Sequence, residues 1–200
     1  VAKLLLDTGK VDVDAKDDSG RTPLWLATER RHETMVKLLL DTGKVDVDTK
    51  DDSGRTPLWL ATEQGHETMV KLLLDTGKVD VDTKDDSGRT PLWLATEKGH
   101  ETMVKLLLDT GKVSIDIRDT VLGHTPLSLA AQNGHEAIVK QLLNMRNVNV
   151  NSRDTSFGRT PLLWAAERGH GSVAKLLLET GKVEVDIKDY SGNTPLWSAA

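Results

Sequence analysis

The dipeptide Thr-Pro recurs at a nearly constant interval along the whole chain, and this periodicity limits the possible folds more than any other feature. Successive copies are 34 or 35 residues apart, and together they contain all six prolines of the chain. The six pairs begin at Thr22, Thr56, Thr90, Thr125, Thr160 and Thr194. A period of this length is typical of repeat proteins, in which each small unit buries its apolar face only against its neighbours.

One unit can be followed from Thr56 onwards. Thr56 is a favourable N-cap, and Pro57 fits the first helical position because its missing N–H is not needed there. The sequence LWLATE then predicts a short first helix that ends before Gly65. Residues 66–76, HETMVKLLLDT, have apolar residues at helical spacing and predict a second helix that Gly77 terminates. The Asp-rich stretch that follows ends in Ser-Gly and predicts an extended finger with a tight turn.

The repeated motifs resemble those of the ankyrin repeat. The matching motifs are TPL in the first helix, Gly-His before the second helix, VKLLL within it, and V-D-x-K-D in the finger. The resemblance covers the whole chain and implies an all-α ankyrin-repeat solenoid of helix–turn–helix units linked by β-hairpin-like finger loops. It also implies that partners bind to the fingers and first helices. Residues 44–77 and 78–111 differ at one place only, and such near-identical units are similar to the 34-residue arrays of fungal NLR-like receptor proteins.

We expect a single array over residues 1–200. Five full units are expected, at 22–55, 56–89, 90–124, 125–159 and 160–193. Residues 1–21 are interpreted as the second helix and finger of a truncated unit, and residues 194–200 as the first helix of another. Solenoids normally have polar capping units at their ends. No such cap is visible in the sequence, so we expect a longer parent protein.

Tryptophan occupies the place where ankyrin units usually have histidine after Thr-Pro-Leu. It stands there at Trp25, Trp59, Trp93 and Trp197, and in the fifth unit it is shifted by one place to Trp164. Two interpretations are open. The indoles pack between neighbouring units, since tryptophan is mostly buried. Alternatively they form an aromatic stripe for a partner, in which case Trp25, Trp59 and Trp93 are candidate contacts.

Binding specificity is expected where the units differ, and the finger tips differ most. The first three tips read Asp-Asp-Ser, whereas the later tips contain Leu122, Phe157 and Tyr190. Apolar residues on exposed loop tips have no evident folding role, so these three are candidate contacts with a protein partner. Alternatively, the longer tips fold back on the neighbouring finger.

No arrangement typical of a catalytic, metal or cofactor site stands outside the repeated pattern. Five histidines share one repeat position: His32, His66, His100, His135 and His170. Equivalent positions in stacked helical units lie about 8–10 Å apart, which is too far to ligate one metal ion. The finger departs from a calcium loop, since Asp51 stands where Gly is needed and Pro57 where Glu is needed. We therefore expect no enzyme, no cofactor and no metal.

Charge and composition exclude other classes of partner. The net charge of −5 argues against a general nucleic-acid binder and against docking on an anionic membrane. There is no cysteine for a disulfide framework, and no apolar run of membrane-spanning length. We expect a cytoplasmic protein–protein interaction module, with the nucleus not excluded, that forms the recognition or scaffold segment of a larger intracellular protein. The alternative is a structural spacer without one specific partner.

Three single positions depart from the repeat. Arg31 and Arg146 stand where other units have glycine. If the backbone there is left-handed, each arginine costs about 1–2 kcal/mol. His124 stands where other fingers have arginine, and its side chain is expected to be exposed.

Overall fold

The computed structural model describes residues 1–200 and contains twelve helices and no strand, as the all-α prediction requires. The chain divides into two compact parts, Val1–Asp86 and Ser87–Ala200, which we call the N-terminal and the C-terminal part. None of the helices has both the length and the apolar character needed to cross a bilayer.

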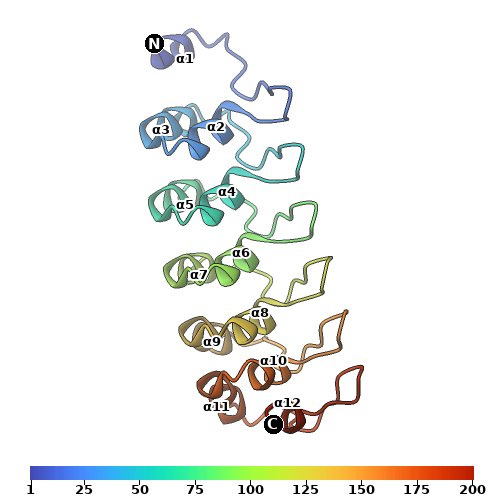
Figure 1. Ribbon diagram of the computed structural model, residues 1–200. Coiled ribbons are helices and arrows are strands. Elements are labelled where there is room, and N and C mark those ends of the chain that lie inside the picture. The colour runs from blue at the N-terminus through green and yellow to red at the C-terminus, as the bar shows by residue number, and fades with distance from the viewer. The chain divides into compact units, whose positions relative to one another are not determined.

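The helices alternate between first and second helices of successive units (Figure 1). Those of the N-terminal part are α1 (Ala2–Asp7), α2 (Pro23–Glu29), α3 (Glu33–Asp41), α4 (Pro57–Glu63) and α5 (Glu67–Leu74). Those of the C-terminal part are α6 (Pro91–Glu97), α7 (Glu101–Asp109), α8 (Pro126–Asn133), α9 (Glu136–Leu143), α10 (Pro161–Glu167), α11 (Gly171–Glu179) and α12 (Pro195–Ser198).

Each Thr-Pro pair starts a first helix, as the sequence predicts. The hydroxyl of Thr56, for example, accepts a hydrogen bond from the backbone N–H of Trp59 at 3.2 Å, and Pro57 is the first residue of α4. The residue before each repeated histidine turns the chain, and Gly65 does so with a left-handed φ of 70°. The second helices begin directly after the repeated histidine, whose side chain makes no capping bond. Local sequence therefore sets where each helix begins.

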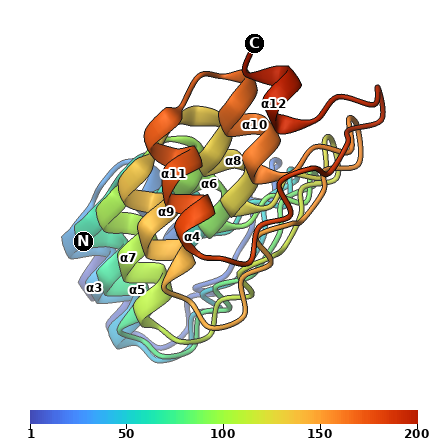
Figure 2. The same cartoon turned by 90° about the horizontal axis from the view of Figure 1, so that it is seen from below.

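Packing between units is the same in both parts of the chain. In the N-terminal part α2 packs on α4 and α3 on α5. In the C-terminal part first helices follow one another from α6 to α12, and second helices from α7 to α11. Within each part, the finger loops project beyond the first helices, on the side away from the second helices (Figure 2). Leu58 and Val70, both fully buried, show how each unit covers its apolar face with its own and neighbouring helices.

The fingers are held by one aspartate each rather than by strand pairing. The Asp51 carboxylate accepts hydrogen bonds from the backbone N–H groups of Ser53 and Arg55, at 3.0 and 2.8 Å. A single backbone bond, from the N–H of Asp52 to the carbonyl of Ser19 at 3.1 Å, joins two adjacent tips. Each finger is closed across its own base, where the N–H of Asp51, for example, donates to the carbonyl of Arg55 at 3.1 Å, so the fingers are hairpin-like turns without a regular strand.

The two arginines that replace glycine behave differently. Arg31 has a φ of 60° and is the only residue other than glycine with a positive φ. Arg146 has no positive φ, so the condition for strain is met at Arg31 but not at Arg146. After α9 the sequence Asn-Met-Arg-Asn replaces Asp-Thr-Gly-Lys and builds a turn that needs no left-handed residue.

Candidate interaction surface

Three of the four tryptophans that follow Thr-Pro-Leu lie between units and are closed to solvent, whereas the fourth, Trp197, is 67% exposed. Trp25, Trp59 and Trp93 are 2%, 2% and 7% exposed. The Trp25 indole Nε1–H donates to the carbonyl of Arg55 in the next finger at 3.2 Å. The Arg55 guanidinium also lies 5.6 Å from the Trp25 ring and 5.7 Å from the Trp59 ring. Of the two interpretations, the structure shows packing, and these three indoles offer a partner almost no surface.

His124 is buried against the next unit, so the expectation that it is exposed is wrong. It is 2% exposed, and its ring lies edge-on to Trp164 with 5.4 Å between centroids. The finger tip of this unit is one residue longer, and the Asp119 carboxylate closes it by accepting from three N–H groups, including that of His124 at 2.8 Å. Burial lowers the pKa of His124, although the Asp119 and Asp154 charges oppose this. The ring is therefore neutral at pH 7.

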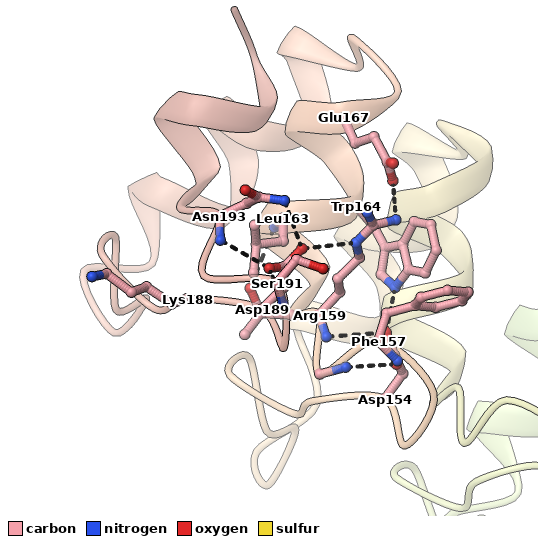
Figure 3. A network of polar contacts seen from close by, with 12 residues as sticks. Asp154, Phe157, Arg159, Leu163, Trp164, Glu167, Lys188, Asp189, Ser191 and Asn193 are labelled. Atoms are coloured by element: carbon pink, nitrogen blue, oxygen red, sulfur yellow. Dashed lines mark hydrogen bonds and ion pairs between the residues drawn. The ribbon is translucent and has the colours of Figure 1, made fainter.

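Trp164 is the centre of a polar and aromatic cluster at the fifth finger (Figure 3). Its Nε1–H donates to the carboxylate of Asp154 at 3.0 Å. The Arg159 guanidinium lies 4.8 Å from the Trp164 ring and pairs with Glu167 and, at 3.4 Å, with Asp189. A positive charge over an indole face is attracted to the ring quadrupole. These contacts fix Trp164 and the finger that precedes it.

Phe157 is half-exposed at the tip of that finger. Its ring lies edge-on to Trp164 with 5.9 Å between centroids, and the Arg159 guanidinium lies 5.2 Å from it. Despite these contacts, 45% of the residue is exposed. Phe157 therefore combines a fixed position with free aromatic surface, as its sequence-based role as a candidate contact requires.

Tyr190 lies over the neighbouring finger and is 66% exposed. A Cβ added to Gly158 would be 2.5 Å from the Tyr190 ring, so the ring rests on the backbone of that residue. The Arg153 guanidinium is 5.4 Å from the ring, and the N–H of Tyr190 donates to the carbonyl of Phe157 at 2.9 Å. Tyr190 therefore folds back on the adjacent finger, as one interpretation of the sequence predicts, and still has exposed surface for a partner, as the other predicts.

The fourth finger places a different residue at the surface from the one expected. Leu122 is half-buried, whereas its neighbour Val121 is 66% exposed. The carbonyl of Leu122 accepts the N–H of Thr155 at 3.0 Å, which joins this tip to the fifth. Val121, Phe157 and Tyr190 therefore form the exposed apolar tips of three successive fingers, and we call them the apolar tips.

An open groove lies beside the fourth finger, and no motif in the sequence indicates it directly. It has a volume of about 760 Å³ and is formed by α6, α8, the fourth finger and the residues that follow α10. Trp93, His124 and Leu122 contribute to its lining, together with the charged side chains of Lys98 and Arg168. The groove depends on the longer finger tip and on residues from three units, which only the folded chain brings together.

No metal site is apparent, since no three His, Asp or Glu side chains gather closely enough to hold an ion. The repeated histidines lie against the preceding unit. His170 Nε2 is 3.1 Å from the carbonyl of Gln132, and the ring of His135 faces the backbone of Gly99. The finger aspartates are occupied by their own turns, as shown for Asp51. These histidines and aspartates therefore stabilise contacts within and between units.

Comparison with known proteins identifies the family. The sequence pattern described as Ankyrin repeats (3 copies) matches residues 1–85, 76–154 and 145–200. The chain belongs to the ankyrin-repeat family. Its repeats therefore form a general protein–protein interaction module, of a fold that serves as a non-enzymatic scaffold.

The structure is also similar to that of a solved ankyrin-repeat protein. It matches the crystal structure of the ankyrin repeat domain of Bcl-3, described as a unique member of the IκB protein family, with a TM-score of 0.86 and 30% sequence identity. The match covers 99% of this chain and 86% of that one. No curated protein sequence matches the chain.

Proposed function

We propose that this chain binds another protein through the apolar tips of its C-terminal part. The observation that carries the proposal is that Phe157 and Tyr190 stay 45% and 66% exposed while fixed contacts hold one side of each ring. A restrained aromatic side chain loses little entropy on binding, and aromatic residues are frequent interface anchors. The tips therefore have the chemistry and the order of a binding surface.

The first fingers make a spacer a weaker candidate. At the places of Phe157 and Tyr190 they have only serine and aspartate, for example Ser53 and Asp52, and their turns are closed in the same way. The finger therefore does not need an aromatic tip in order to fold. A spacer without a partner would gain nothing from the aromatic residues of the later fingers.

The same proposal includes the larger protein to which the array belongs. We place the array in a larger intracellular protein, as its recognition or scaffold segment. The near-identity of residues 44–77 and 78–111 supports an array of the kind found in fungal NLR-like receptors. The acidic character of the chain, with a net charge of −5, supports a protein partner over nucleic acid.

The test compares proteins captured by the immobilised full chain from extracts of cells that produce it. We expect Phe157→Ser combined with Tyr190→Ser to reduce capture of the specific partner at least ten-fold, measured by quantitative mass spectrometry. Asp52→Ser is the matched control, because Asp52 stands in the second finger at the place of Tyr190, and it should leave capture unchanged. Equal capture by the wild-type chain, the double variant and the Asp52→Ser variant would favour the spacer.

A further inference from the structure

Three residues that line the groove occupy the same position in three successive units, and two of them are positively charged. Lys98 follows α6, Asn133 ends α8 and Arg168 follows α10, and all three line the groove and are exposed. Glu97 is the only carboxylate in the lining, because the residue at its place in the next unit is Gln132. The lining therefore presents two cations and one carboxylate, with a neutral amide between the two cations.

The floor of the groove contains polar atoms without a partner in the protein. The Trp93 indole Nε1 is buried and makes no hydrogen bond, although the equivalent atom of Trp25 donates to the next finger at 3.2 Å. The longer fourth finger places the buried His124 ring in this lining, and its Nε2 is also buried without a partner. An indole N–H can only donate, and a neutral imidazole donates from one of its two nitrogens. The floor thus lacks a negative acceptor.

We propose that this groove binds an acidic segment of the partner protein, with one carboxylate paired to Lys98 and a second paired to Arg168, above the Trp93 and His124 floor. The inference rests on the proposed function and adds the chemistry of the partner. A carboxylate accepts hydrogen bonds only, so it matches a site that has cations at the rim and unpaired donors below. The floor atoms are shielded in the free protein, so the two rim cations make the first contact. An anion above the floor favours the His124 tautomer with its proton on Nε2.

The test is a titration of the ¹⁵N-labelled full chain with a capped hexapeptide, Gly-Asp-Glu-Asp-Glu-Gly, followed by the NMR signal of the Trp93 indole N–H. We expect the acidic peptide to shift this signal and the same peptide with Asn and Gln in place of Asp and Glu to leave it unchanged. Lys98→Gln combined with Arg168→Gln should weaken binding at least ten-fold. Arg30→Gln combined with Lys71→Gln removes the same charge from exposed sites of the N-terminal part and should leave binding unchanged.

Two further measurements separate this inference from the proposed function. Trp93→Phe keeps an aromatic ring at this buried position and removes the N–H, and it should weaken peptide binding several-fold, followed at the backbone signal of Arg168. No shift at millimolar peptide, equal shifts with the neutral peptide, or tighter binding of a ten-residue oligothymidylate would overturn the acidic-segment assignment. Partner capture that is lost with Phe157→Ser and Tyr190→Ser but kept with Lys98→Gln and Arg168→Gln would overturn it while leaving the proposed function intact.

Discussion

The residue before each repeated histidine has a left-handed backbone in all five full units, and this one angle determines which side chains are tolerated there. φ is 70° at Gly65 and 60° at Arg31, and L residues with a side chain are strained in this region. We expect Arg31→Gly to stabilise the protein by about 1 kcal/mol. Relief of about 1–2 kcal/mol of strain exceeds the roughly 0.4–1 kcal/mol by which glycine favours the unfolded chain. The midpoint of urea unfolding measures the difference.

Arg146→Gly is the control at the same residue scale. Arg146 also replaces a repeat glycine, but its φ is not positive, so glycine there only adds freedom to the unfolded chain. Stability should fall by up to about 1 kcal/mol. An equal rise in the free energy of unfolding of both variants, or no rise for Arg31→Gly, would show that backbone strain at Arg31 does not limit stability.

The finger is the element whose stability depends most on a single charge. The Asp119 carboxylate accepts from the N–H groups of Val121, Leu122 and His124 at 2.8, 2.7 and 2.8 Å. Burial alone would raise the pKa of Asp119, but these hydrogen bonds outweigh it and lower the pKa below its usual value. Because the folded pKa lies below the unfolded one, its contribution to stability is present above the unfolded pKa of about 3.9 and is lost as the pH falls through the folded pKa.

Asp119→Asn should therefore destabilise the protein at pH 7 by about 1–3 kcal/mol, because the amide NH₂ faces a backbone donor that is left without an acceptor. The deficit should shrink as the pH falls below the unfolded pKa of about 3.9, because the stabilisation by the wild-type carboxylate is then progressively lost. Thermal unfolding at a series of pH values gives both results. Asp109→Asn changes the same charge at an exposed site and should have little effect at any of these pH values. A deficit that stays constant with pH would contradict the assignment to the carboxylate.

At the scale of the whole molecule, the parts that could be predicted are those coded within one unit. Thr56 and Pro57 start a helix through contacts with residues three or four places away, so the sequence alone locates it. The surroundings of His124 depend on Trp164, which lies 40 residues further along the chain. The extra residue in the fourth finger is visible in the sequence, but the resulting burial of His124 is a tertiary effect. The groove could not be predicted from the sequence for the same reason, because residues from three units form it.

A ladder of side chains also runs along the array, in which a finger residue of one unit accepts a backbone N–H of the next. Its links join Asp14 to Asp46, Asp48 to Asp80, Asp116 to Asn149 and Asn151 to Glu184, at 3.1, 2.9, 3.0 and 3.0 Å. Burial raises the pKa of Asp48 more than the bond from Asp80 lowers it, and the charges of Asp80 and Asp46 raise it further. Asn151 makes the same link without a charge, and its Nδ2 also donates to the carbonyl of Lys182 at 3.0 Å.

Asp48→Asn should therefore stabilise the protein at pH 7, by about 0.5–1 kcal/mol, the size of one added hydrogen bond. The amide keeps the acceptor for the N–H of Asp80 and gives the buried, unpartnered Oδ1 position a donor. Because the folded pKa of Asp48 is raised, its protonated form favours the native state, and that contribution is present at low pH and lost as the pH rises through the folded pKa. The gain of the variant should thus disappear towards pH 3.

Removing any negative charge also relieves repulsion in a chain of net charge −5, so Asp75→Asn, at an exposed site, is the control. An equal gain in Asp75→Asn would assign the effect to net charge, and a gain that persists at pH 3 would exclude the Asp48 carboxylate as its source.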